Sequence, residues 1–83
     1  MNKLIYISST WCQPCKTLAP IMDQVSSTGI PVQKIDADQN PEITSQYGVR
    51  SVPTVIKVNS SGGEIGRFSG IKQVQEIINF YNN

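Results

Sequence analysis

Both cysteines of this 83-residue chain lie three residues apart, within the segment Trp11-Cys12-Gln13-Pro14-Cys15-Lys16. That spacing brings the two sulfurs within reach of each other only if the segment forms the first turn of a helix. Pro14 suits such a turn, because its missing N–H has no intrahelical partner there. The unpaired N–H groups of a helix start favour a thiolate and lower the pKa of a cysteine in such a motif. The segment therefore predicts a redox-active dithiol.

Three other roles for the two cysteines are less well supported by the sequence. A disulfide that closes only two intervening residues removes little entropy from the unfolded chain, so it would stabilise the fold poorly. A zinc site normally needs four ligands, and the chain has no histidine and no second cysteine pair, so no metal site is expected. Inert packing of both thiols is disfavoured by Trp11 and Pro14 beside them.

Length and composition predict one small domain spanning residues 1–83. The chain is 39% hydrophobic and 16% charged with a net charge of +1, and its lysines and arginines are scattered. This pattern lacks the basic stripe of a nucleic-acid-binding protein. Only four apolar residues, Leu4 to Ile7, follow the N-terminus, too few for a signal peptide or a membrane span. We therefore expect a cytoplasmic protein, where a Cys-x-x-Cys pair is more often catalytic than structural.

The order of elements predicts an α/β fold. β-forming or alternating segments predict strands over residues 3–8, 32–36, 54–58 and 64–69, the first of them buried on both faces. Helices are expected at residues 13–27, from Asn40-Pro41 to Tyr47-Gly48, and along a C-terminal apolar stripe (Ile71, Val74, Ile77, Ile78 and Tyr81). The turn residues Asn59 to Gly63 predict that the last two strands form a hairpin. The order β-α-β-α-β-β-α indicates three layers around a four-stranded mixed sheet. The cysteines then follow the first strand, at the edge where open α/β sheets place their sites.

Several separated motifs resemble the thioredoxin family over nearly the whole length of the chain. The cysteine segment resembles WCGPCK, with Gln13 in place of the usual glycine, and Ala19-Pro20-Ile21 resembles API. The segments Asp38–Pro41 and Tyr47–Thr54 resemble DxNP and YGIRGIPT. The resemblance implies a thioredoxin-like fold and a thiol–disulfide oxidoreductase that reduces protein disulfides.

The resemblance also implies roles for individual residues. Cys12, expected to be the more exposed sulfur, attacks the target disulfide, and Cys15 resolves the mixed disulfide. Pro53 is expected to be a cis-proline facing the sulfurs. The substrate-binding residues are expected to be Trp11, Gln13, Pro14, Val52, Pro53 and Gly70.

The partners implied by the resemblance are protein disulfides, with ribonucleotide reductase a common one, and an NADPH-dependent flavin reductase as electron donor. The chain itself is expected to bind no cofactor, to act as a monomer, and to contact neither nucleic acid nor membrane.

Tyr6 departs from the family pattern. It occupies the position of a buried aspartate thought to help deprotonate the second cysteine, and a tyrosine with a pKa near 10 cannot serve as a carboxylate base at neutral pH. Lys34, the usual partner of that aspartate, is expected to lack one. Either Asp36 or water completes the proton relay around Tyr6 and Lys34, or resolution by Cys15 is slower.

Two alternative functions stay open. A glutaredoxin-like enzyme reduced by glutathione is favoured by Tyr6 and by the short N-terminus, but Trp11 and the order Val52-Pro53-Thr54 argue against it. A non-catalytic thioredoxin-fold subunit would keep its role after both cysteines are replaced by serine, whereas the enzyme would lose all activity.

Overall fold

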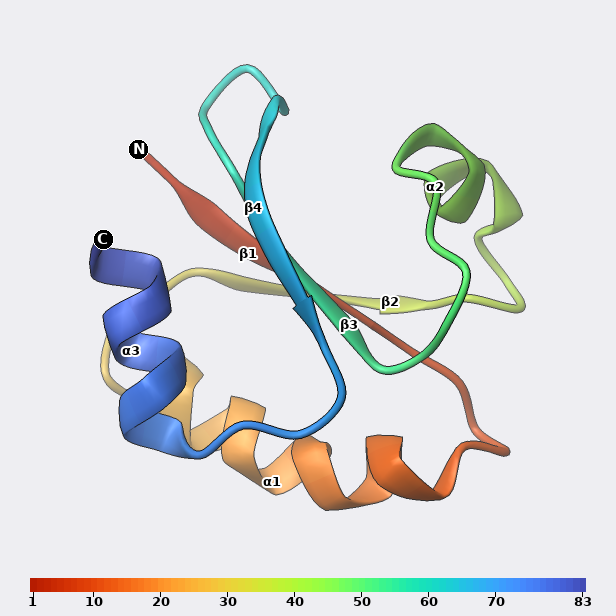
Figure 1. Cartoon of the computed structure of the whole chain (residues 1–83), viewed down its shortest axis with the longest axis horizontal. Helices are drawn as coiled ribbons and strands as arrows, with labels where there is room; N and C mark the ends of the chain where they lie inside the picture. Colours follow the sequence, from red (N-terminus) through yellow and green to blue (C-terminus); the bar gives the residue numbers. More distant parts are fainter.

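The computed structural model describes all residues from 1 to 83. Its elements follow the predicted order: β1 (Lys3–Ser8), α1 (Gln13–Ser27), β2 (Val32–Asp36), α2 (Pro41–Gln46), β3 (Thr54–Val58), β4 (Glu64–Ser69) and α3 (Val74–Asn82). Figure 1 shows β1 and β3 passing through the middle of the molecule, with helices on either side of the sheet. The predicted α/β fold with a four-stranded mixed sheet is confirmed.

The sheet has the strand order β2-β1-β3-β4. β1 pairs in parallel with β2, as expected for two strands joined by a helix, and antiparallel with β3. β3 and β4 form the predicted antiparallel hairpin. β1 lies between two strands, and both faces of the sheet are covered, so its residues from Leu4 to Ile7 are all buried, as the run of apolar residues indicated.

Helices cover both faces of the sheet. On one face α1 and α3 pack over a core whose buried members include Leu4, Leu18, Met22, Val55 and Ile77. On the other face the short helix α2 and its flanking loops cover a second core, formed by Ile5, Ile7, Ile35, Ile56 and Val58. Alternate residues of β1 thus enter different cores, which is the period of a strand buried between two layers. None of the helices is long and apolar enough to cross a membrane.

The ends of α2 and α3 follow from local chemistry. α2 ends at the predicted place, where Gly48 takes a positive φ of 62°, a conformation that glycine adopts readily at a helix end. α3 begins later than its apolar stripe suggested, so the placement of Ile71 on this helix is wrong. The backbone N–H of Gln73 donates to Glu76 Oε1 at 3.2 Å, which fixes the first turn at Val74. Ile71 instead lies in the preceding loop with 45% of its surface exposed.

Candidate active site

Cys12 and Cys15 form a disulfide at the start of α1, with their Cα atoms 5.3 Å apart. Cys12 occupies the N-cap position, and the backbone N–H of Cys15 donates to Cys12 Sγ at 3.2 Å. Pro14 stands in the first helical turn, as predicted. After reduction, this N–H and the positive end of the helix favour negative charge on Cys12 Sγ over the same charge on Cys15.

Exposure does not distinguish the two cysteines. Cys12 is 4% and Cys15 is 3% exposed, so the expectation that Cys12 is the more exposed residue is not met in the disulfide form. The two differ in their neighbours instead. Cys12 Sγ lies 3.6 Å from the carbonyl oxygen of Val52, in the loop before β3, whereas Cys15 lies on the side of Tyr6.

The loop before β3 brings the predicted cis-proline to the disulfide. The Val52–Pro53 peptide bond is cis, as the resemblance implied. The backbone N–H of Gly70 donates to the carbonyl oxygen of Pro53 at 3.0 Å, so the loop after β4 is attached to the same place. Gly70 has a φ of 86°, which favours glycine over any residue with a side chain. The structure therefore gathers Cys12, Val52, Pro53 and Gly70 at one end of the sheet.

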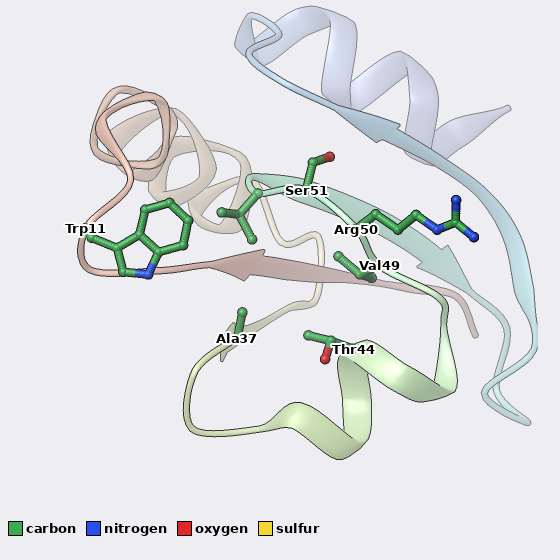
Figure 2. Close-up of a pocket in the computed structure, with 7 residues that line it drawn as sticks. Trp11, Ala37, Thr44, Val49, Arg50 and Ser51 are labelled. Atoms are coloured by element: carbon green, nitrogen blue, oxygen red, sulfur yellow. The ribbon is translucent and has the colours of Figure 1, made fainter.

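Trp11 is 71% exposed and flanks the disulfide. Its indole Nε1 donates to Asp38 Oδ2 at 2.9 Å, which fixes the ring at the mouth of a shallow pocket (Figure 2). Sequence reasoning quoted Asp38 only as part of a motif and did not name it as a site residue. A signal was present, because Asp38 follows β2 and Trp11 follows β1, and parallel neighbouring strands end at the same edge of the sheet.

The Trp11 pocket encloses about 210 Å³ and is lined by Trp11, Ala37, Thr44, Val49, Arg50, Ser51 and Val52. Figure 2 shows the guanidinium of Arg50 directed away from Trp11, so the charged end of this side chain lies away from the indole. The hydroxyl of Thr44 donates to the carbonyl oxygen of Pro41 at 2.9 Å and is thus already paired. The pocket is therefore largely apolar and adjoins the carbonyl group beside Cys12.

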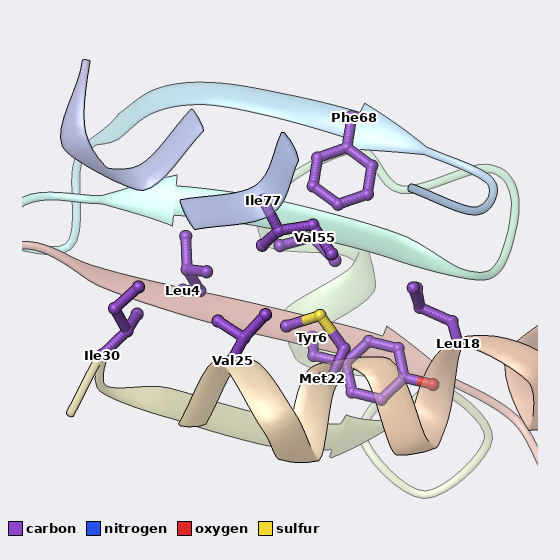
Figure 3. Close-up of a cluster of buried hydrophobic side chains, with 9 residues drawn as sticks. All are labelled: Leu4, Tyr6, Leu18, Met22, Val25, Ile30, Val55, Phe68 and Ile77. Carbon is purple, nitrogen blue, oxygen red and sulfur yellow. The ribbon is translucent and has the colours of Figure 1, made fainter. Parts of the chain in front are cut away.

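Tyr6 belongs to the buried core between the sheet and α1 (Figure 3). Its hydroxyl donates to the carbonyl oxygen of Cys15 at 3.0 Å, and burial raises its pKa above the usual value. Tyr6 thus holds the first turn of α1 as a neutral donor. A second cavity of about 320 Å³, here called the rear pocket, is lined by Tyr6, Ser8, Ser9, Thr10, Cys15, Lys16, Ala19 and Lys34.

The two other relay candidates take different positions. Lys34 does have a partner, which corrects the expectation, because its Nζ lies 2.6 Å from Asp23 Oδ1 on α1. Asp36 does not line the rear pocket; its Oδ1 accepts the backbone N–H of Asp38 at 2.9 Å. The structure therefore brings Tyr6 and Lys34 together with Cys15 and leaves Asp36 at the end of β2, outside the rear pocket. Gln13 is exposed on the outer side of α1.

Fold and site together define a class of protein: an α/β domain with a disulfide at a helix start, facing a cis-proline. The family model for thioredoxin matches residues 1–83. A thioredoxin of Rickettsia bellii is 36% identical over 83 residues, covering 96% of this chain and 78% of its own length. The chain therefore belongs to the thioredoxin family.

Solved structures agree with this assignment. A point-mutant thioredoxin of Halobacterium salinarum superimposes with a TM-score of 0.87 at 29% identity, covering 98% of this chain and 72% of its own. Thioredoxin 1 of Thermosipho africanus gives a TM-score of 0.79 at 31% identity, covering 96% and 90% of the two chains. Family membership and the Cys12–Cys15 pair make the chain a thiol–disulfide oxidoreductase that acts on protein disulfides.

Proposed function

We propose that this chain acts as a reductant of protein disulfides, with Cys12 as the attacking sulfur and Cys15 as the resolving one. The observation that carries the assignment is the hydrogen bond from the Cys15 N–H to Cys12 Sγ. A donor at a helix start lowers the pKa of the sulfur that it faces, and the thiolate is the nucleophile. Cys12 also adjoins Val52 and the Trp11 pocket, where a target can approach.

The reaction transfers two electrons from the chain to the target. The Cys12 thiolate attacks one sulfur of the target disulfide, the target S–S bond breaks, and the other target sulfur leaves and takes up a proton. The Cys15 thiolate then attacks Cys12 Sγ, the mixed disulfide breaks, and the second target sulfur leaves as a thiol. The Cys12–Cys15 disulfide of the structure is the product of this step.

The loop before β3 supplies the docking position. The backbone of Val52, next to Cys12 Sγ, is available to pair with an extended segment of the target. Such strand addition gives affinity through main-chain hydrogen bonds and makes little demand on target sequence. In this proposal Trp11, Gln13, Pro14, Pro53 and Gly70 surround the bound segment.

The physiological setting is part of the proposal. An NADPH-dependent flavin reductase returns the disulfide to the dithiol, and ribonucleotide reductase is among the targets. The chain works as a monomer in the cytoplasm, in electron transport.

Trapping of mixed disulfides tests the roles of the two sulfurs. With Cys15→Ser, the first step proceeds and the target stays attached to Cys12, so covalent adducts accumulate on non-reducing gels. With Cys12→Ser, we expect no adducts and no turnover. Adducts on Cys15 in the Cys12→Ser variant would show that Cys15 is the attacking sulfur. Adducts with neither variant would contradict the mixed-disulfide mechanism.

The reduction potential of the Cys12–Cys15 couple tests the direction of electron flow. A value near or below about −230 mV supports a reductant, whereas about −180 mV or higher indicates an oxidant or isomerase. Recycling by glutathione alone would favour the glutaredoxin-like alternative. Full biological function of the double Cys→Ser variant would favour a non-catalytic subunit.

A further inference from the structure

The second chemical step requires Cys15 to lose its proton, and the side chains around it offer no base. On β1, the Tyr6 hydroxyl already donates a hydrogen bond to the Cys15 carbonyl oxygen. Burial raises the pKa of Tyr6, so its hydroxyl stays protonated at neutral pH. Lys16 on α1 and Lys34 on β2 are cations. No carboxylate and no imidazole lines the rear pocket.

The carboxylates of α1 and β2, Asp23 and Asp36, already have other partners. Asp23 on α1 is paired with Lys34 at 2.6 Å, at a site where both side chains are more than half exposed. Asp36 at the end of β2 accepts the backbone N–H of Asp38. A base for Cys15 therefore has to come from outside the chain.

The rear pocket is the cavity through which such a base can reach Cys15. It holds about 320 Å³, room for a small ion with its water, and Cys15 forms part of its wall. Its lining includes three residues with hydroxyl groups, Ser8, Ser9 and Thr10, and two lysines, of which Lys34 is paired with Asp23 and Lys16 has no carboxylate partner. The buried Ser9 Oγ has no hydrogen-bond partner in the chain, which is uncommon for a buried hydroxyl. The unpaired ammonium group of Lys16, the neighbouring hydroxyl groups and the absence of an acidic residue from the lining suit an oxyanion.

We propose that the rear pocket binds a small oxyanion from solution, a carboxylate or a phosphate, and that this ion is the general base for Cys15. The proposal rests on the proposed role of Cys15 as the resolving sulfur. The bound anion takes the proton of the Cys15 thiol. The resulting thiolate attacks Cys12 Sγ, the bond between Cys12 and the target breaks, and the departing target sulfur takes up a proton from the protonated anion or from water.

A bound anion can act on Cys15 in two opposite ways, and the direction of its effect on the rate of resolution distinguishes them. As a general base it removes the proton and speeds resolution. As a mere negative charge it disfavours the Cys15 thiolate and slows resolution. Acceleration of the second step therefore supports the proposal, and inhibition overturns it.

The two steps can be followed separately with 4,4′-dithiodipyridine. This disulfide carries no carboxylate, and it releases one absorbing thiopyridone when Cys12 attacks and a second one when Cys15 resolves. Stopped-flow traces of the reduced protein are recorded at fixed pH and ionic strength while acetate or phosphate replaces chloride. We expect the second phase to accelerate about threefold or more and the first phase to stay unchanged. A second phase that does not respond to either anion overturns the proposal.

Charge variants of the two lysines locate the effect in the rear pocket. Lys16→Gln and Lys34→Gln should each reduce the acceleration of the second phase at a given anion concentration by about two- to fivefold, as expected for partly exposed charges. Lys72→Gln is the matched control, because Lys72 lies beside Phe68 and Glu76 and does not line the pocket. Equal effects of all three substitutions would indicate a general response to net charge and contradict the site.

The same traces distinguish failure of this proposal from failure of the proposed function. If the first phase is normal and the rate of the second phase does not depend on the anions, the anion site is excluded and the proposed function is retained. Absence of the first phase in wild-type protein would remove the nucleophilic role of Cys12 itself.

Discussion

The indole of Trp11 and the carboxylate of Asp38 are joined by a hydrogen bond of 2.9 Å, although 27 residues separate them in the chain. Trp11 follows β1 and Asp38 follows β2, so the bond ties together two loops at one edge of the sheet. An exposed aromatic side chain loses rotational freedom when it is fixed in this way. The ring is thereby pre-positioned beside the disulfide, which lowers the entropic cost of binding a target there.

Asp38→Ala should weaken target binding by releasing the Trp11 ring. We expect KM for a protein disulfide to rise about two- to tenfold, the range of a partly exposed hydrogen bond to a charged acceptor, with kcat changed less. Trp11 is the only tryptophan of the chain, so its fluorescence anisotropy reports the freed ring directly. Asp38→Asn keeps an acceptor oxygen and should restore most of the affinity. Unchanged KM and anisotropy in Asp38→Ala would contradict the anchoring role.

Ala37→Phe should block the Trp11 pocket, because Ala37 lines it with the smallest side chain of the set. Targets that insert an apolar side chain there should show a KM raised about threefold or more, the loss of one modest apolar contact. The small disulfide 4,4′-dithiodipyridine has no peptide segment that must dock in the pocket and serves as the control substrate. Equal losses with both substrates would show that the substitution disturbs the disulfide rather than the pocket.

The strands and helices could be predicted because their signals are local. An unbroken apolar run from Leu4 to Ile7 indicated a doubly buried strand, and Asn59 to Gly63 marked the hairpin turn. Ile71 was misplaced for a physical reason: its spacing fits the stripe of α3, but the positive φ of Gly70 and the Gln73 cap start the helix three residues later. Periodicity gives the face of a helix more reliably than its first residue.

The site was predictable only where its chemistry is contiguous in sequence. Cys12 and Cys15 could be named from their spacing, whereas the cis Val52–Pro53 bond required the family resemblance, since most X-Pro bonds are trans. The partner of Trp11 and the pairing of Lys34 with Asp23 arise from packing between elements. No local pattern encodes such contacts.

Lys57→Met should destabilise the fold without affecting the dithiol. Lys57 on β3 is only 4% exposed, and its Nζ donates to the carbonyl oxygens of Phe80 and Asn83 at the end of α3. Methionine keeps the apolar stem but leaves these carbonyls without their charged donor, so we expect a loss of about 1–3 kcal/mol in the free energy of unfolding. Urea denaturation measures it, with Lys72→Met on the surface as the control. A loss no larger than that of the control would show that water replaces the ammonium group.

Tyr6→Phe should change how stability depends on pH. At neutral pH the variant loses the hydrogen bond to the Cys15 carbonyl oxygen, which costs about 0.5–1.5 kcal/mol. Burial raises the pKa of Tyr6 above 10.0, so at high pH the unfolded chain loses this proton before the folded chain does. The contribution of the hydroxyl is therefore complete below about pH 10 and declines as the pH rises through the folded pKa.

Urea denaturation of both proteins between about pH 7 and pH 11 tests this relationship. The stability of wild-type protein should fall faster above about pH 10 than that of Tyr6→Phe, so the gap between the two narrows and can reverse. Replacing Tyr6 by phenylalanine removes the titrating group and keeps the ring in the core, so packing changes little. Two stability curves that remain parallel over this range would mean that Tyr6 titrates alike in the folded and unfolded chains, and the buried hydroxyl would then not be held in its neutral form by the fold.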